Sequence, residues 1–208
     1  MAHPVKVIGI GPGSPDYLLP AARQAVEACR VVIGAPRCLA LFDLAGKEVH
    51  VLTGDLSRLL PLVRYRTPQD PVGILVSGDP GFYSLLSFLR RYFPPEKIEV
   101  VPGISSVQVA FARLKLPWQD AHLLSLHGRE LEGLEFYVNS RRPLGLLVDP
   151  RTTGWELQRL LESYGSFRVH ICRNLTYPEE EIVTLPVTEL ARVQDLGNAV
   201  VVIEPDET

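Results

Sequence analysis

The chain has few cysteines, few sulfur-containing or indole side chains, and no excess of one charge. Its 208 residues include three cysteines, one methionine and two tryptophans, and 21 Lys and Arg nearly balance 24 Asp and Glu. A pI near 6.0 argues against a protein that binds nucleic acid through its overall charge. A protein with this pI can still carry a local basic patch. An apolar share of 46% excludes a disordered chain and predicts a globular one.

Long apolar runs and targeting signals are also missing. The runs at Val31–Ile33 and Gly73–Val76 fall far short of the roughly 18 residues of a membrane-spanning helix. No basic, cleavable leader precedes the apolar run that begins at Val5. The cysteines lie in apolar runs and lack the spacing of a zinc or redox pair, which predicts buried thiols. We therefore expect a cytoplasmic protein that has no membrane contact and no metal site of its own.

Short apolar runs alternate with helical patterns in the first half of the chain. This alternation predicts a parallel sheet with helices on its faces. The expected strands are Val5–Ile10, Arg30–Gly34, Glu48–Leu52, Val72–Val76 and Ile98–Val101. The expected helices are Leu18–Cys29, Pro36–Phe42, a helix capped by Asp55 and running to Val63, Phe82–Tyr92 and Ile104–Leu114.

The second half has a less regular pattern. The segment Leu116–Asp120 interrupts the alternation and predicts a linker, so we expect two α/β domains at residues 1–116 and 121–208. Trp155–Tyr164 is the clearest helix of the second domain. Its expected strands, which indicate a more mixed sheet, are Ala121–Leu126, Leu144–Val148, Arg168–Arg173, Glu181–Leu185 and Ala199–Ile203.

Three turn-rich loops follow predicted strands, where open α/β sheets bind their ligands. The first is Gly9–Ser14, which superficially suggests a dinucleotide fingerprint. Ser14 replaces the third glycine of that fingerprint, and Pro12 removes a backbone donor that a phosphate cradle would use. Taken alone, this loop is as compatible with a structural turn as with a binding site.

The second and third loops are Ser77–Gly81 and Pro102–Ser106. In the second, Asp79 places a carboxylate at the edge of the sheet, although an Asp-Pro pair is also an ordinary helix entry. In the third, Ser105 and Ser106 can cap a helix or offer hydroxyls and amides to a ligand. Each loop alone leaves both interpretations open.

Together the three loops resemble the tetrapyrrole methylase family. Four further segments resemble the precorrin C5-methyltransferases of cobalamin synthesis within that family, and these are Gly11–Leu18, Gly78–Ser84, Ser125–Arg129 and Asn174–Glu180. The resemblance implies two α/β domains, with S-adenosylmethionine in the cleft between them, and methyl transfer to C5 of a cobalt-precorrin or a metal-free precorrin. It also implies a stand-alone enzyme, because 208 residues leave no room for the C15-methylating domain of the fused relatives.

The resemblance implies a set of site residues. The cofactor-binding residues would be Pro12, Ser77, Gly78, Asp79, Phe82, Ser105, Ser106, Val148 and Leu175. The macrocycle carries acetate and propionate groups, which arginine binds in bidentate fashion. The candidate substrate-binding residues are Arg129, Arg141, Arg142 and Arg151. His127 and Asp79 are the candidates for a base, because methylation at C5 requires the loss of a proton.

Other functions remain compatible with these residues. The chain could methylate another carbon of the macrocycle, or it could act on ribosomal RNA or the diphthamide precursor, as other family members do. A cofactor-binding regulatory module without turnover is a further alternative. The resemblance implies a homodimer and no nucleic-acid partner, and a separate C15-methyltransferase/decarboxylase is a candidate partner.

Overall fold

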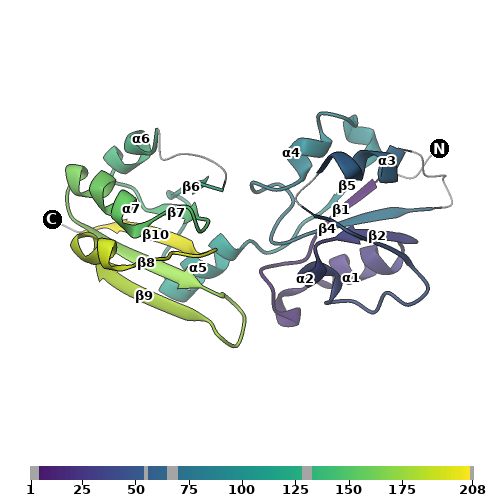
Figure 1. The fold of residues 1–208 in the computed structure, drawn as a ribbon, viewed down its shortest axis with the longest axis horizontal. Coiled ribbons are helices and arrows are strands. Elements are labelled where there is room, and N and C mark those ends of the chain that lie inside the picture. Colours follow the sequence, from purple (N-terminus) through teal and green to yellow (C-terminus); the bar gives the residue numbers. More distant parts are fainter. Residues whose placement is uncertain (1–4, 54–55, 65–69, 128–132, 207–208) are drawn as a thin grey trace. The chain divides into compact units, whose positions relative to one another are not determined.

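The structure, a computed structural model, describes residues 5–53, 56–64, 70–127 and 133–206 (Figure 1). These residues form two compact units, residues 1–105 and 106–208. No helix in the described part of the chain is long and apolar enough to cross a membrane. Asp55, the expected helix cap, lies outside the described residues.

The first unit is a parallel sheet with helices on both faces (Figure 1). Its five strands lie in the order β3-β2-β4-β1-β5. The strands are β1 Val5–Gly9, β2 Val31–Gly34, β3 Glu48–Val51, β4 Val72–Val76 and β5 Ile98–Val101. The helices are η1 Pro15–Tyr17, α1 Pro20–Glu27, α2 Pro36–Leu39, η2 Leu56–Arg58, α3 Leu59–Arg64, α4 Leu86–Leu89 and η3 Pro95–Lys97. All five strands predicted for this half are confirmed.

Each face of this sheet has its own apolar core, because successive side chains of a strand point to opposite faces. On β2, Val32 packs in a cluster with residues of α1 and α2, such as Ala22. Its neighbour Ile33 packs in a second cluster with residues of α3 and α4, such as Leu59. Every residue of β2 and of β4 is buried, as expected for central strands of a parallel sheet covered on both sides.

The helix predicted over Phe82–Tyr92 is wrong for its first turn. Residues 81–85 form turns and bends, and only Leu86–Leu89 is α-helical. Tyr83 has a φ of 48°, a left-handed conformation that a helix cannot contain. The helix predicted over Pro36–Phe42 is also shorter and ends at Leu39.

The second unit contains a mixed sheet with the strand order β6-β7-β10-β8-β9. Strands β6 and β7 are parallel, and β10 runs antiparallel to both β7 and β8. The strands are β6 His122–Ser125, β7 Leu144–Leu147, β8 Phe167–Arg173, β9 Glu181–Pro186 and β10 Val200–Pro205. The helices are α5 Ser106–Leu114, α6 Leu134–Asn139, α7 Gly154–Leu161, η4 Glu162–Tyr164 and η5 Val187–Arg192. The mixed sheet and the helix beginning near Trp155 are confirmed, whereas α6 was not predicted.

Helix α5 belongs with the second unit. It packs on β7 and β10, and its Phe111 side chain is fully buried. The two units therefore divide between Ser105 and Ser106, ahead of the linker expected at Leu116–Asp120. The extent of two separate domains, 1–116 and 121–208, stays a prediction.

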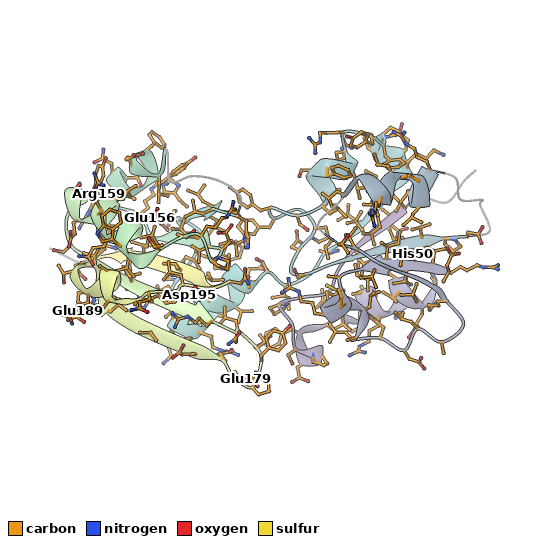
Figure 2. The ribbon with its side chains drawn as sticks, viewed as in Figure 1. His50, Glu156, Arg159, Glu179, Glu189 and Asp195 are labelled. Carbon is orange, nitrogen blue, oxygen red and sulfur yellow. The ribbon has the colours of Figure 1, made fainter. Side chains whose placement is uncertain are left out.

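Helix α7 begins with a capping box. The Thr153 hydroxyl accepts a hydrogen bond from the Glu156 N–H, and the Glu156 carboxylate accepts one from the Thr153 N–H (Figure 2 labels Glu156). These bonds satisfy backbone donors that the first turn of a helix leaves free. The Thr153 hydroxyl also donates to the Glu156 carboxylate over 2.7 Å, and this bond, together with the one from the Thr153 N–H, holds the pKa of Glu156 below its ordinary value.

All three cysteines are free and buried, as predicted. Burial raises the pKa of the Cys29 thiol to about 11 and that of Cys172 to about 12. Burial also raises the pKa of Cys38, against a smaller opposing effect of the neighbouring Arg37 cation. Such thiols stay protonated near neutral pH and act as small apolar side chains.

Candidate active site

The three loops of the first unit meet at the carboxyl edge of its sheet. Strand β1 pairs with β4 on one side and with β5 on the other, and all three strands are parallel. The loops that follow them are therefore neighbours. Gly11 and Gly78 form an isolated β-bridge between the first and second loops, in which the Gly78 N–H donates to the Gly11 carbonyl over 2.7 Å.

The backbones of these loops pack against one another without intervening side chains. A Cβ atom added to Gly103 would lie 2.8 Å from the carbonyl carbon of Gly9 and still closer to the carbonyl oxygen of Gly78. A Cβ atom on Gly9 would lie 2.7 Å from the Gly103 nitrogen. Real Cβ atoms do not approach other atoms so closely, so glycine is required at both positions. The result is an edge built of backbone that a ligand can approach closely.

Asp79 joins the second loop to the third. Its Oδ1 accepts a hydrogen bond from the Gly81 N–H over 2.7 Å, and its Oδ2 accepts one from the Gly103 N–H over 3.1 Å. The helix-entry interpretation of Asp79 is wrong, because the next α-helix begins only at Leu86. Both carboxylate oxygens are held by backbone donors, which favours a loop-fixing role over that of a base.

The other predicted first-unit residues lie along the same loops. Pro12 and Phe82 are half-buried, and the Phe82 ring meets the Tyr83 ring edge-on at a centroid distance of 5.0 Å. Ser105 is buried, and its Cα lies 3.7 Å from where a Cβ of Gly78 would be. Ser77 is exposed. The structure thus brings five loop residues predicted for the cofactor to one edge, and a sixth, Pro12, lies in the first of these loops.

Three of the predicted second-unit residues lie at the carboxyl ends of β6, β7 and β8, and the fourth lies at the start of α5. Val148 follows β7 and is part of the apolar core, and its N–H donates to the Ala199 carbonyl over 3.2 Å. Leu175 follows β8 and is buried. His127 follows β6 with an exposed side chain, and its N–H donates to the Ser125 hydroxyl over 3.3 Å. Ser106 begins α5.

The predicted arginines are spread over both ends of the second sheet. Arg151 follows β7, and its guanidinium binds the Asp149 carboxylate, with an Nη2–Oδ2 distance of 2.6 Å. This pairing raises the pKa of Arg151. Arg141 and Arg142 precede β7 and so lie at its amino end. Arg129 lies outside the described residues.

Arg141 is committed to contacts within the second unit. Its guanidinium donates to the carbonyl oxygens of Tyr164, Ser166 and Asp206, and its Cζ lies 4.9 Å from the centre of the Phe167 ring. These contacts connect the amino ends of β7 and β8 with the residue that follows β10. The structure therefore does not bring Arg141 together with Arg151 or His127.

Sequence reasoning missed an ion pair that holds the turn after β8. Arg113 of α5 binds the Glu180 carboxylate, and Glu180 Oε2 also accepts from the Thr176 N–H over 2.7 Å. The same turn contains two non-glycine residues with positive φ, Asn174 and Thr176. Glu179, labelled in Figure 2, lies in this β8–β9 connection. No local signal predicts this ion pair, because its partners are 67 positions apart.

Sequence reasoning also missed Arg37, which follows β2 and lies beside the second loop. Its Nη2 donates to the Ser77 hydroxyl over 3.2 Å. The sequence signal for it is its position three residues after a buried strand, directly after an Ala-Pro pair. No group of three or more His, Cys, Asp or Glu side chains in the described ranges is arranged to hold a metal ion.

Comparisons with known proteins agree with this architecture. Residues 4–191 match the tetrapyrrole (corrin/porphyrin) methylases. The chain is 30% identical to a probable cobalt-precorrin-7 C(5)-methyltransferase of Methanocaldococcus jannaschii, over 98% of this chain and 99% of the relative. It is 32% identical to the cobalt-precorrin-7 C(5)-methyltransferase of Salmonella typhimurium, over 95% and 98% respectively. A probable cobalt-factor III C(17)-methyltransferase of Methanothermobacter thermautotrophicus is 34% identical over only 59% of this chain and 36% of its own length.

Solved structures show the same fold. A cobalamin biosynthesis precorrin-6Y methylase from Archaeoglobus fulgidus superimposes with a TM-score of 0.75 at 24% identity, covering 99% of this chain and 100% of the other. A uroporphyrin-III C-methyl transferase from Thermus thermophilus, complexed with S-adenyl homocysteine, gives a TM-score of 0.74 at 23% identity, covering 97% and 92%. Enzymes of this family take their methyl group from S-adenosyl-L-methionine. The chain is a methyltransferase that belongs to the tetrapyrrole (corrin/porphyrin) methylases.

Proposed function

We propose that this enzyme methylates C5 of a cobalt-precorrin, with cobalt-precorrin-7 or its metal-free counterpart as acceptor. One observation carries the proposal: two C5-methyltransferases match the chain over nearly their whole lengths. The C17-methyltransferase matches only 59% of the chain. Methylation of another carbon of the macrocycle is therefore the second candidate.

The edge formed by the first-unit loops suits S-adenosyl-L-methionine. At Gly9 and Gly103 the loops pack so tightly that a Cβ would overlap neighbouring backbone. Such an edge offers main-chain groups at close range instead of long, mobile side chains. We propose that Pro12, Ser77, Gly78, Phe82 and Ser105 contact the cofactor and that Asp79 fixes the loops. Ser106, Val148 and Leu175 are the contacts that we propose from the second unit.

Methyl transfer requires the protein mainly to align the two reactants. When bound, the cofactor supplies a methyl group on a positively charged sulfur, which keeps the electron pair of the broken bond. The chain's own residues must hold the acceptor carbon in line and exclude water, and positioning of this kind is worth several kcal/mol, up to about ten. One proton leaves the macrocycle for each methyl gained. We propose the exposed His127 as its acceptor, since the Asp79 oxygens already accept backbone hydrogen bonds.

Carboxylates of the macrocycle need basic partners at the same end of the second sheet. Arg151 lies there and already holds a carboxylate, that of Asp149. We propose that it binds a substrate acetate or propionate, as Arg129 would. Arg141 and Arg142 lie at the other end of β7, and we propose no substrate contact for them. A homodimer and an association with a separate C15-methyltransferase/decarboxylase stay proposals as well.

Methyl-labelled cofactor tests the proposed function directly. The purified enzyme is incubated with carbon-13 methyl S-adenosyl-L-methionine and cobalt-precorrin-7, and in parallel with metal-free precorrin-7. NMR of the product is expected to place the label at C5, and the faster of the two reactions gives the metal preference. Label at another carbon would refute the C5 assignment within the family. Cofactor binding without transfer to either macrocycle would favour a non-catalytic or non-tetrapyrrole role.

A further inference from the structure

Arg37 brings a cation to the edge where the first-unit loops meet. It follows β2, which pairs with β4 through Ile33 and Ile74, so its segment lies beside the loop that follows β4. The side chain reaches that loop, because Nη2 donates to the Ser77 hydroxyl over 3.2 Å. Arg37 is itself exposed, so its guanidinium is within reach of a ligand.

Arg37 supplies the positive charge of this edge. In residues 9–18, 34–39, 77–84 and 101–105, all of which the structure describes, it is the sole Lys or Arg. Of the carboxylates there, Asp79 is held by the N–H groups of Gly81 and Gly103. The adjacent Cys38 is buried and keeps its proton, as argued above from its raised pKa. A negatively charged ligand group at this edge would therefore meet one guanidinium.

Several arginines of the described chain form ion pairs with its carboxylates. Arg30 pairs with Asp70, Arg113 with Glu180, and Arg173 with Glu181. For Arg37, no carboxylate of a described residue is within ion-pair distance, and its partners are two neutral groups, the Ser77 hydroxyl and the adjacent Cys38 thiol. Guanidinium has five N–H donors in a planar fork that matches a carboxylate, so bonds to these two groups leave most of them available.

We propose that Arg37 is a carboxylate-binding residue of the methyl-transfer site. The inference rests on the proposed function only in placing the two reactants at this edge. The carboxylate has two chemical sources: the methionine moiety of the cofactor, or an acetate or propionate of the macrocycle. Ser77 orients the guanidinium toward it by accepting one N–H.

Paired ligands with and without the carboxylate distinguish the sources. For the cofactor, the binding of S-adenosylhomocysteine is compared with that of 5′-methylthioadenosine, which lacks the amino-acid portion. For the macrocycle, cobyrinic acid is compared with cobinamide, whose side chains are amides. Titration calorimetry of the full-length protein gives Kd for each. Loss of a hydrogen bond between charged groups corresponds to about a ten-fold weakening or more.

The variant Arg37→Gln is expected to weaken the binding of the ligand that carries the carboxylate and to leave the binding of its partner ligand unchanged. If the variant binds S-adenosylhomocysteine more weakly but binds 5′-methylthioadenosine as the wild type does, Arg37 binds the carboxylate of the cofactor. If the variant binds cobyrinic acid more weakly but binds cobinamide as the wild type does, Arg37 binds a carboxylate of the macrocycle. Arg37→Lys keeps the charge without the fork and should give an intermediate loss.

Arg30→Gln is the matched control. Arg30 precedes β2 at the opposite end of the same strand, its side chain is 69% exposed, and it pairs with Asp70. It should leave all four Kd values unchanged. The proposal is overturned if Arg37→Gln also leaves them unchanged, if it weakens both members of a pair equally, or if the wild-type protein binds none of the four. The label position in the C5 experiment does not enter these outcomes, so the two proposals fail separately.

Discussion

Arg113 and Glu180 form a two-point ion pair, with an Nε–Oε1 distance of 2.6 Å and an Nη2–Oε2 distance of 3.3 Å. Because Glu180 Oε2 also accepts the Thr176 N–H, the cation at the end of α5 fixes the turn that follows Leu175. Thr176 has a φ of 73°, a conformation that is unfavourable for a β-branched residue and persists only where its surroundings hold it.

Removing the Glu180 carboxylate should therefore loosen a proposed cofactor contact more than it unfolds the protein. We expect Glu180→Ala to raise the Kd of S-adenosylhomocysteine several-fold. The free energy of unfolding should fall by only about 1–2 kcal/mol, because the ion pair is partly exposed and the amide that loses its acceptor is half-buried. Titration calorimetry and urea unfolding measure the two quantities.

Glu181→Gln is the control for this experiment. Glu181 is the next residue along the chain and pairs with Arg173 over 2.9 Å, with 56% of its side chain exposed. Breaking that pair should change neither quantity appreciably. If the two variants weaken S-adenosylhomocysteine equally, the Arg113–Glu180 pair has no specific effect on the turn.

The same carboxylate should make stability depend on pH. Hydrogen bonds from Arg113 and from the Thr176 N–H hold the pKa of Glu180 below its ordinary value. A lowered pKa in the folded state means that the stabilisation is complete above the unfolded value of about 4.3. It is lost as the pH falls through the folded pKa. The difference in unfolding free energy between wild type and Glu180→Gln should thus be largest near pH 7 and shrink below about pH 4. Urea unfolding at several pH values measures it, and a difference that stays constant down to pH 3 would contradict the assignment.

Asp79 should behave as a loop-fixing residue and not as a base. Asp79→Ala leaves the exposed Gly81 N–H and the half-buried Gly103 N–H without their acceptor. Water can replace the acceptor at Gly81, so the cost in stability comes from Gly103 and is about 1 kcal/mol. We expect S-adenosylhomocysteine binding to weaken at least ten-fold, with a smaller loss in Asp79→Asn. A base would instead leave that Kd unchanged and lower kcat. Asp43→Asn is the control, because Asp43 accepts the Ala45 N–H in a similar exposed turn. It should change neither the Kd of S-adenosylhomocysteine nor kcat.

The glycine at the third loop provides a steric test. Gly103→Ala would place its Cβ 2.8 Å from the Gly9 carbonyl carbon and nearer still to the Gly78 oxygen. Backbone would have to move, so we expect a loss of more than about 2 kcal/mol in stability together with loss of S-adenosylhomocysteine binding. Gly46→Ala meets no atom within 4 Å but has a φ of 76°, and should cost only about 1–2 kcal/mol. Equal losses in thermal unfolding would mean that the loops are not in close contact.

Local patterns predicted the strands and the loops that follow them. The run Val72–Val76 is apolar and ends at a turn, so both the strand and the position of Ser77 could be predicted. The failed helix at Phe82 has a non-local cause: Asp79 bonds to Gly103, 24 positions further along the chain. That contact fixes the second loop in a form that helical periodicity cannot reveal.

The arginines show the same limit of sequence reasoning. A charge beside a predicted strand is visible in the sequence, but the end of the sheet it occupies depends on topology. Arg141 precedes β7 and bonds to carbonyls near residues 164–166 and 206. The contact of Arg37 cannot be predicted from local sequence, because its partner, Ser77, is 40 positions away.

Substitutions of Arg141 and Arg151 should distinguish a structural arginine from a substrate-binding one. Arg141→Ala removes three bonds to carbonyls and the contact with the Phe167 ring. We expect stability to fall by about 1–2 kcal/mol while KM for the macrocycle stays unchanged. Arg151→Ala removes a side chain that is 73% exposed and should raise KM about ten-fold. It also leaves the buried Asp149 carboxylate without its cation, so its melting temperature should fall as well. Thermal unfolding and initial rates measure both variants. A raised KM in Arg141→Ala, with Arg151→Ala unaffected, would place the substrate at the amino end of the second sheet instead.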